Sequence, residues 1–143
     1  MVILAVDYGD ARTGLAVCDQ GELLASPAGV IAERNAQRCL DKIAAEAQRL
    51  GAALLVVGLP LNMDGSFGPR AEKCRDFAAQ LGERCGLPVE LWDERCTTVA
   101  AHQALNVTDT RGKKRKAVVD AVAAVLILEG YLAYRKNQAG RLE

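Results

Sequence analysis

The stretch VILAVDYGDARTGLAV, residues 2–17, decides the fold. Its first five residues are aliphatic and uncharged, a pattern typical of a strand that is buried on both faces of a sheet. The strand ends on a carboxylate, Asp7, and Gly9 and Gly14 flank a turn that leads into a second apolar run. We therefore expect a hairpin of two antiparallel strands. Asp7 either caps the turn through a local hydrogen bond or belongs to a functional site at the strand end.

The composition predicts a single folded domain in the cytoplasm. The chain has 143 residues, half of them hydrophobic, which is enough for one domain with a substantial core. Five widely spaced cysteines without a C-x-x-C pair fit a reducing compartment better than a disulfide framework or a zinc knuckle. No signal-peptide pattern is visible, and the longest apolar run, residues 121–128, is far shorter than the roughly 20 residues that span a bilayer. We expect one domain over residues 1–143, no membrane partner, and a frayed tail over 137–143.

The charges are balanced in number but not in position. The chain carries 18 basic and 18 acidic residues, which argues against a protein that coats nucleic acid along its whole surface. Residues 1–110 hold 10 basic and 15 acidic side chains, whereas residues 111–143 hold 8 basic and 3 acidic ones. A basic C-terminal segment on an acidic body indicates an anionic partner that is met on one side.

The hydrophobic periodicity predicts an α/β fold. Further strands are expected over 22–32, with a break at Pro27, and over 52–57 and 87–92. Helical spacing predicts helices over 34–50, 70–85 and 117–136, and a short one from Thr97 or Thr98 to Leu105. A strand that follows a helix joins its sheet in parallel through a crossover. The result is a mixed five-stranded sheet, with three antiparallel strands first and two parallel strands after them, flanked by helices.

Three carboxylates occupy positions where an ionised group is unfavourable. Asp7 ends a central strand, Glu94 follows another strand, and Asp120 interrupts an otherwise apolar helix. An ionised carboxylate in apolar surroundings is destabilising unless a cation or hydrogen bonds compensate it. A shared hard cation would compensate all three, and oxygen ligands without histidine or cysteine suit Mg²⁺ or Mn²⁺. Such a site is the usual means of cutting or transferring at phosphate.

Basic residues lie beside these carboxylates in the sequence. Arg12 and Arg95 each stand near a proposed metal ligand, and an arginine binds phosphate through paired hydrogen bonds, although Arg95 could equally pair with a neighbouring acid. Immediately before the helix that carries Asp120 comes a run of positive charge, which either contacts the phosphate backbone of RNA or is a solvated loop. The members of this run are Arg111, Lys113, Lys114, Arg115 and Lys116.

Four motifs stand in order along the chain and together resemble the YqgF family. They are D-Y-G-x-x-R-x-G at residues 7–14, G-L-P-x-x-x-x-G-x-x-G-P-x-A at 58–71, D-E-R-x-T-T at 93–98, and K-x-x-x-D-x-x-A-A-x-x-I-L at 116–128. Members of this family are described as pre-16S rRNA nucleases and as similar to Holliday junction resolvases, on an RNase H-like fold. The resemblance covers nearly the whole chain.

The resemblance implies a metal-dependent nuclease that matures the 5′ end of precursor 16S rRNA, with Asp7, Glu94 and Asp120 as catalytic residues and metal ligands. Many RNase H-like sites use four carboxylates, whereas the positions three residues before and after Asp120 are Ala117 and Ala123. One or two metal ions therefore both remain open, with Asp93 as a possible further ligand. The implied partners are precursor ribosomal RNA and the small ribosomal subunit.

Three other functions stay open at this point. A non-catalytic RNA-binding module could use the basic run alone, although it would gain little from carboxylates that face RNA. A Holliday junction resolvase would act on branched DNA instead of RNA. An ATPase of the actin or sugar-kinase type would use residues 7–14 as a phosphate-binding hairpin, but such proteins need two domains of this kind.

Overall fold

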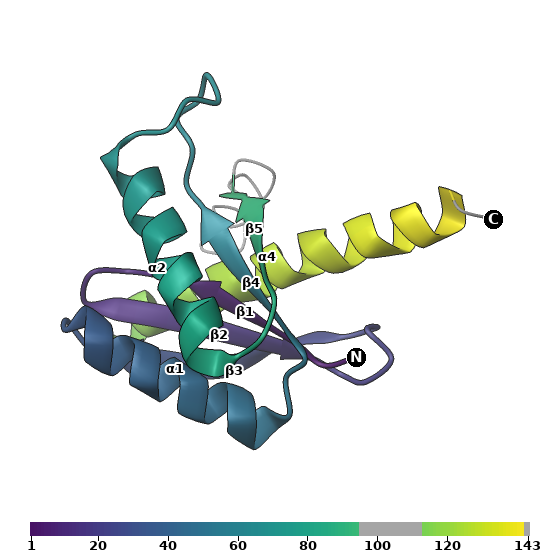
Figure 1. Ribbon diagram of the computed structural model, residues 1–143, viewed down its shortest axis with the longest axis horizontal. Coiled ribbons are helices and arrows are strands. Elements are labelled where there is room, and N and C mark those ends of the chain that lie inside the picture. The colour runs from purple at the N-terminus through teal and green to yellow at the C-terminus, as the bar shows by residue number, and fades with distance from the viewer. Residues whose placement is uncertain (95–112, 142–143) are drawn as a thin grey trace.

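A five-stranded mixed sheet forms the centre of the molecule. The computed structural model describes residues 1–94 and 113–141, with the side chains of 122–138 in the second range. The strands lie in the order β3-β2-β1-β4-β5, and α1 and α2 cover one face while α4 covers the other (Figure 1). The strands are β1 (Ile3–Asp7), β2 (Arg12–Cys18), β3 (Ala25–Ala32), β4 (Leu54–Leu59) and β5 (Val89–Asp93). The helices are α1 (Ala36–Leu50), α2 (Pro69–Cys85) and α4 (Lys113–Arg141).

The strand pairing confirms the predicted sheet. Strands β1, β2 and β3 pair antiparallel, and β4 pairs in parallel with both β1 and β5. Parallel strands place their carboxyl ends at the same edge of a sheet. Asp7 at the end of β1 and Asp93 at the end of β5 therefore both lie at the carboxyl edge, on either side of Leu59 at the end of β4.

The central strand β1 is buried on both faces, as its composition predicts. Leu4 and Val6 belong to the apolar cluster beneath α1 and α2, whereas Ile3 and Ala5 belong to the cluster beneath α4. All four are fully buried, because successive side chains of a strand point to opposite faces. The second cluster also includes four residues of α4, namely Ala124, Ile127, Leu128 and Tyr131.

The edge strand β3 accommodates a proline through a bulge. Leu15 pairs with Gly29 and Ala16 with Pro27, so the register shifts between these two pairs, and Gly29 has a φ of 120°. A proline removes one backbone donor, and an edge strand tolerates this loss best. The predicted break is therefore an irregularity inside one strand.

The helix ends follow the expected signals at α1 and α2 but not at α4. The side chain of Asn35 accepts a hydrogen bond from the backbone of Arg38 at 3.0 Å, and Gly51, with a φ of 70°, ends α1. Helix α4 begins at Lys113 rather than at residue 117, and continues to Arg141 rather than ending near residue 136. Lysine, arginine, glutamine and alanine are good helix formers, so a polar run prolongs the helix at each end. The part of the basic run over residues 113–116 is thus helical.

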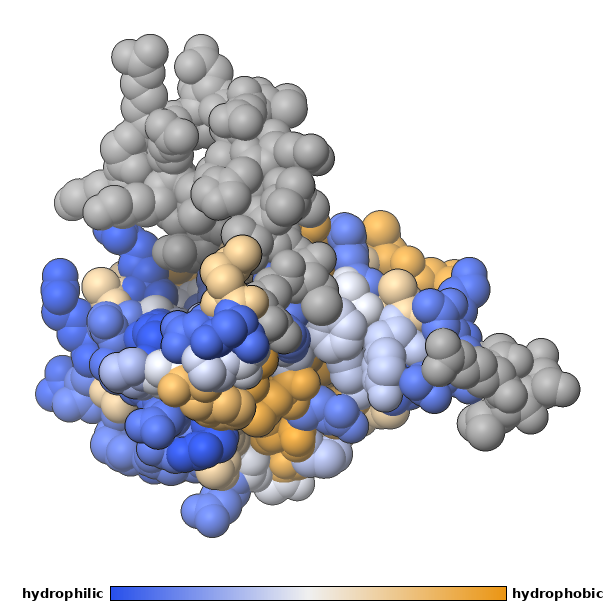
Figure 2. Space-filling model, turned by 90° about the horizontal axis from the view of Figure 1, so that it is seen from above, coloured by the Kyte–Doolittle hydropathy of each residue, from blue (hydrophilic) through white to orange (hydrophobic). Residues whose placement is uncertain are grey.

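The outward surface of α1 and α2 is hydrophilic. The exposed residues of both helices are mostly charged or polar, and blue side chains gather on the left in the view from above, the side on which α2 lies (Figure 2). Within the described part of the chain, no helix is long and apolar enough to cross a membrane.

Candidate active site

Two of the three predicted carboxylates meet at the carboxyl edge of the sheet. Asp7 ends β1 and Glu94 directly follows β5, so β4 lies between the strands that carry them. The side chains of Asp7 and Glu94 nevertheless hydrogen-bond to each other. The Glu94 side chain therefore reaches across β4 toward β1.

Gly58 of β4 makes this reach possible. A Cβ atom at position 58 would lie 2.9 Å from Cδ of Glu94 and 2.6 Å from Cδ1 of Ile127 on α4. Real Cβ atoms essentially never approach other atoms within 3.0 Å. Because Gly58 has no Cβ atom, there is space between the sheet and α4 for the side chain of Glu94. Gly58 is the first residue of the sequence motif at 58–71, but the reason for a glycine there comes from the neighbouring side chains.

Burial makes the Glu94 carboxyl hard to ionise. Loss of solvent raises the pKa of Glu94, and the charge of Asp93 raises it further. The hydrogen bond with Asp7 and the charge of Arg70 act in the opposite direction. Two carboxyl groups that share a hydrogen bond need a proton between them, and a cation in the same place also relieves their repulsion. The pair therefore has oxygen donors and electrostatics that suit a hard divalent cation.

The first turns of α2 lie beside this pair. Burial raises the pKa of the Cys74 thiol to about 11, the charges of Glu94, Asp7 and Asp10 add to the increase, and Arg70 opposes it. Four charged side chains from three segments of the chain thus act electrostatically on one buried thiol. A thiol with a raised pKa is mostly protonated at neutral pH, which disfavours a role as a nucleophile.

Arg70 is a site residue that the sequence analysis missed. Its Nη1 donates a hydrogen bond to Oδ1 of Asp10 at 3.0 Å, and its Nη2 donates to the backbone carbonyl of Tyr8. The guanidinium lies 5.4 Å from the centre of the Tyr8 ring, which in turn stacks on Phe77 with ring centroids 3.7 Å apart. Lys73, one turn further along α2, also donates to Oδ1 of Asp10. The available signal was Pro69, which fixes the start of α2 and so places these two cations at the site.

The other predicted site residues fall into three groups. Arg12 begins β2 and lines a surface depression whose other residues include Ala32, Glu33 and Arg34. No contact among the described residues joins Arg12 to Asp7. Arg95 and Arg111 lie outside the described residues. Asp120 and the four basic residues Lys113, Lys114, Arg115 and Lys116 lie in α4, but their side chains are outside the described part.

The position of Asp120 along α4 relates it to the acid pair. It stands seven residues before Ile127 and four before Ala124, so all three positions lie on one face of the helix. Ile127 and Ala124 are buried against the sheet, and Ile127 is the residue that a Cβ at Gly58 would meet. Among the described side chains, no group of three histidine, cysteine, aspartate or glutamate residues is arranged to hold a metal ion. The third predicted ligand lies outside that set.

Comparison with solved structures identifies the fold of the protein. T. thermophilus RuvC in complex with a Holliday junction substrate has a TM-score of 0.61 and 13% identity, and the match covers 96% of each chain. The fowlpox virus Holliday junction resolvase has a TM-score of 0.55 and 13% identity, covering 94% of this chain and 99% of that one. The fold is that of the RNase H-like resolvases, as the motifs predict.

Within this class the chain belongs to the RuvX family, described as Holliday junction resolvase, which it matches over residues 1–134. A protein of Halothermothrix orenii named "Putative pre-16S rRNA nuclease" is 43% identical over 140 residues, covering 98% of this chain and all of that protein. A protein of the same name from Pelotomaculum thermopropionicum is 43% identical over 133 residues, covering 92% of this chain and 86% of the other. The resemblance to the YqgF family is thereby confirmed, and with it an enzyme that hydrolyses phosphodiester bonds.

Proposed function

We propose that this protein is a metal-dependent nuclease that cuts precursor 16S rRNA during maturation of its 5′ end. The observation that carries the proposal is the Asp7–Glu94 pair, which reaches across Gly58 at the carboxyl edge of the sheet. The names of the relatives support RNA as the substrate. A pair of half-buried acids that face each other is unfavourable for folding, which supports a functional reason for its presence.

Asp7 and Glu94 would hold the proposed metal ion, with Asp120 as the third ligand. When bound, Mg²⁺ or Mn²⁺ supplies positive charge that orients water and stabilises the attacking and leaving oxygens. Glu94 directly follows β5, and its side chain lies over Gly58, where a Cβ atom would also meet Ile127, so these neighbours would restrict its carboxyl before substrate arrives. Asp7 is fixed by its pairing with Gly14 in the β1–β2 ladder. Two rigid strands thus position the two ligands.

The predicted RNA-binding residues remain part of the proposal. Arg12, Arg95 and the basic run would bind phosphates on either side of the bond that is cut. The run adds five positive charges within six residues, so binding should weaken steeply as salt rises. The members of the run are Arg111, Lys113, Lys114, Arg115 and Lys116.

The test is cleavage of a labelled 5′-leader fragment of precursor 16S rRNA in Mg²⁺, Mn²⁺ or EDTA. We expect cleavage by the wild type with either metal, no cleavage in EDTA, and no cleavage by Asp7→Asn or Asp120→Asn. Asp76→Asn is a matched control, since Asp76 is an exposed acid on α2. Cleavage that persists in both site variants would place the chemistry elsewhere. Salt-sensitive RNA binding without any cleavage would favour the non-catalytic binding module.

A second candidate function is cleavage of branched DNA. The family description favours it, because it refers to a Holliday junction resolvase. The same protein preparation should therefore be given a labelled four-way DNA junction under the same metal conditions. Faster cleavage of the junction than of the RNA leader, lost in Asp7→Asn, would make DNA the substrate.

A further inference from the structure

Two cations near the acid pair are bound to a single exposed carboxylate. Arg70 and Lys73 of α2 both donate to Oδ1 of Asp10, which lies in the turn between β1 and β2. The side chains are 38% exposed at Arg70, 53% at Lys73 and 68% at Asp10. Ion pairs with this much solvent contribute little to stability, so exchange of one anion for another is energetically easy. Asp10 is the weakly held member of the group.

Arg70 itself is oriented independently of Asp10. Its Nη2 donates to the carbonyl of Tyr8, and its guanidinium lies against the Tyr8 ring, 5.4 Å from the ring centre. Tyr8 is buried and stacks on Phe77 of α2. If Asp10 moves away, these contacts still hold the guanidinium, with its Nη1 edge directed toward the place that Asp10 leaves.

The place that Asp10 occupies is close to the proposed metal ligands. The charge of Arg70 acts on Glu94, and Asp10 is three residues from Asp7 across the start of the β1–β2 turn. A phosphodiester oxygen accepts the same charge-assisted hydrogen bonds from an arginine and a lysine as a carboxylate oxygen does. An RNA strand that crosses the acid pair would therefore bring a neighbouring phosphate to Arg70 and Lys73.

We propose that Arg70 and Lys73 bind a phosphate of the substrate next to the bond that is cut, and that Asp10 occupies this phosphate site until RNA displaces it. Asp10 then holds the two cations in place in the free protein and competes with RNA for them. This inference rests on the proposed function, because it takes the Asp7–Glu94 pair as the place of cleavage. It adds a phosphate site and a competing carboxylate to that function.

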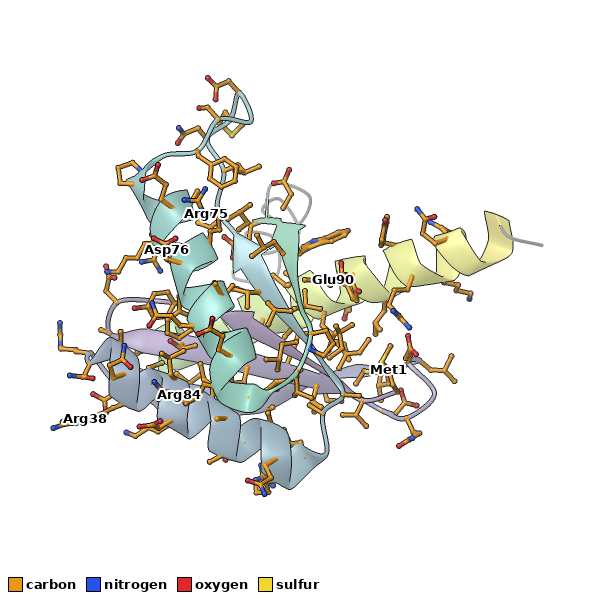
Figure 3. The ribbon with its side chains drawn as sticks, in the orientation of Figure 1. Met1, Arg38, Arg75, Asp76, Arg84 and Glu90 are labelled. Atoms are coloured by element: carbon orange, nitrogen blue, oxygen red, sulfur yellow. The ribbon has the colours of Figure 1, made fainter. Side chains whose placement is uncertain are left out.

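The opposite end of α2 offers a matched control. Arg84 pairs with Asp41 and with Gln37 of α1, and Figure 3 shows Arg84 between these two helices. Asp41 is 66% exposed, almost the same as Asp10, and Asp41→Asn changes the net charge by the same amount as Asp10→Asn. Lys42, 52% exposed and paired with Glu33 at 3.0 Å, is the corresponding control for Lys73.

The experiment measures RNA binding without cleavage. A fluorescein-labelled single-stranded RNA copied from the 16S rRNA precursor leader is titrated with the full chain in EDTA, by anisotropy, at several KCl concentrations. Asp10→Asn should bind about 3- to 10-fold tighter than wild type, because the competing carboxylate is gone. Lys73→Gln should bind more weakly than wild type. The slope of its log affinity against log salt concentration should be smaller in magnitude by about 0.7. The gain in affinity from Asp10→Asn should be smaller in the Lys73→Gln background than in the wild-type background.

The controls separate a local exchange from a general effect of charge. Asp41→Asn and Lys42→Gln should each change the affinity by less than about 2-fold. Unchanged or weaker binding by Asp10→Asn, with thermal unfolding showing an intact fold, would overturn the inference. So would an equal gain in affinity from Asp41→Asn. Lys73→Gln provides a second test if Asp10→Asn loosens the turn, because Lys73 is exposed and its described hydrogen bond goes to Asp10 alone.

A parallel cleavage assay in Mg²⁺ keeps the two proposals distinguishable. If wild type cuts the RNA but Asp10→Asn does not bind more tightly, the nuclease proposal stands and the phosphate exchange is wrong. If Asp10→Asn tightens binding but no variant cuts, the exchange site exists on a protein that only binds RNA.

Discussion

Two glutamates at opposite ends of the sheet have opposite electrostatic environments. Glu22, beside the N-terminus, accepts a hydrogen bond from Nε of Arg135 at 2.7 Å and one from the amino group of Met1 at 3.1 Å. These cations, Arg135 first, lower the pKa of Glu22. Glu94, at the carboxyl edge, is half-buried, and this loss of solvent raises its pKa, while its hydrogen bond is shared with a second acid, Asp7. Both glutamates adjoin α4, so the helix alone does not set the difference.

The comparison shows how a structural carboxylate differs from a candidate catalytic one. At Glu22 the chain supplies cations, and the interaction ties α4 to the N-terminus. At Glu94 the chain brings two acids together where they are partly shielded from solvent. This arrangement disfavours the folded state unless a proton or a metal ion lies between them. Function at Glu94 therefore opposes stability, whereas at Glu22 there is no such conflict.

The largest expected effect is the separation of activity from stability at the two glutamates. Glu94→Gln should reduce the cleavage rate at least about 100-fold, since one group that handles the developing charge is lost. Its stability in EDTA should equal or exceed that of wild type, because an amide can donate to Asp7 without a charge. Glu22→Gln should show the reverse, with normal cleavage and lower stability.

Single-turnover cleavage in Mg²⁺ and urea unfolding in EDTA measure these two quantities on each variant. A Glu94→Gln protein that is clearly less stable than wild type would show that the carboxylate has a structural role similar to that of Glu22. Glu94 and Glu22 would then have the same role in the fold.

The next largest effect is expected at Gly58. Gly58→Ala places a methyl group where Glu94 and Ile127 already lie, and it must displace one or both. Overpacking of this kind costs about 1–3 kcal/mol of unfolding free energy. Because the displaced side chain includes Glu94, cleavage should also fall, by at least about 10-fold through misplacement of a metal ligand.

Gly82→Ala is the control for Gly58→Ala, because it brings a Cβ to 2.9 Å from Cγ2 of Val89, at the start of β5 and so at the end of that strand opposite to the acid pair. It should lower stability but leave cleavage unchanged. A loss of cleavage in Gly82→Ala equal to that in Gly58→Ala would mean that overpacking itself impairs activity.

The pH dependence of stability should have opposite signs at the two glutamates in metal-free buffer. A lowered pKa at Glu22 stabilises the fold above the usual carboxyl value of 4.5, and this contribution is lost as pH falls through the lowered value. A raised pKa at Glu94 has the reverse effect, so stability is lost as pH rises from 4.5 through the raised value.

Urea midpoints measured between about pH 3 and about pH 7 test these signs. Glu22→Gln should reduce the loss of stability that occurs as the pH falls below 4.5. Glu94→Gln should reduce the loss of stability that occurs as the pH rises above 4.5. Two variants with the same profile would contradict the comparison.

The sequence predicted the elements but not the contacts between them. The apolar run of β1, the glycine that ends α1 and the alternation of strands and helices follow from local patterns, and the structure confirms them. Asp7 and Glu94 stood out because each polar residue ends an apolar strand. Arg70 did not stand out, because its partner Asp10 is 60 residues away and an arginine on an amphipathic helix is unremarkable.

Gly58 opens one of the four motifs, but its role beside Glu94 could not be predicted, and neither could the ends of α4, for related reasons. The importance of Gly58 depends on two side chains from other elements, and no pattern within β4 refers to them. The start of α4 at Lys113 depends on helix propensity continuing through a charged run, which also fits a loop. Local patterns therefore predict the position of a functional side chain on its strand or helix. The packing of the elements determines which of these side chains form a site.

The smallest expected effect concerns the cation at Glu22. Arg135→Gln removes two hydrogen bonds to Glu22 and a guanidinium 5.9 Å from the centre of the Tyr131 ring, but leaves the amino group of Met1 in place. Because the pair is partly exposed, the loss should be about 1 kcal/mol or less at low salt and smaller at high salt. Urea unfolding at low and high NaCl measures it, with Arg49→Gln, which breaks an exposed pair within α1, as the control. A larger loss that does not respond to salt would mean that Arg135 stabilises the fold through packing on Tyr131, and Glu22 would then owe less of its low pKa to a true ion pair.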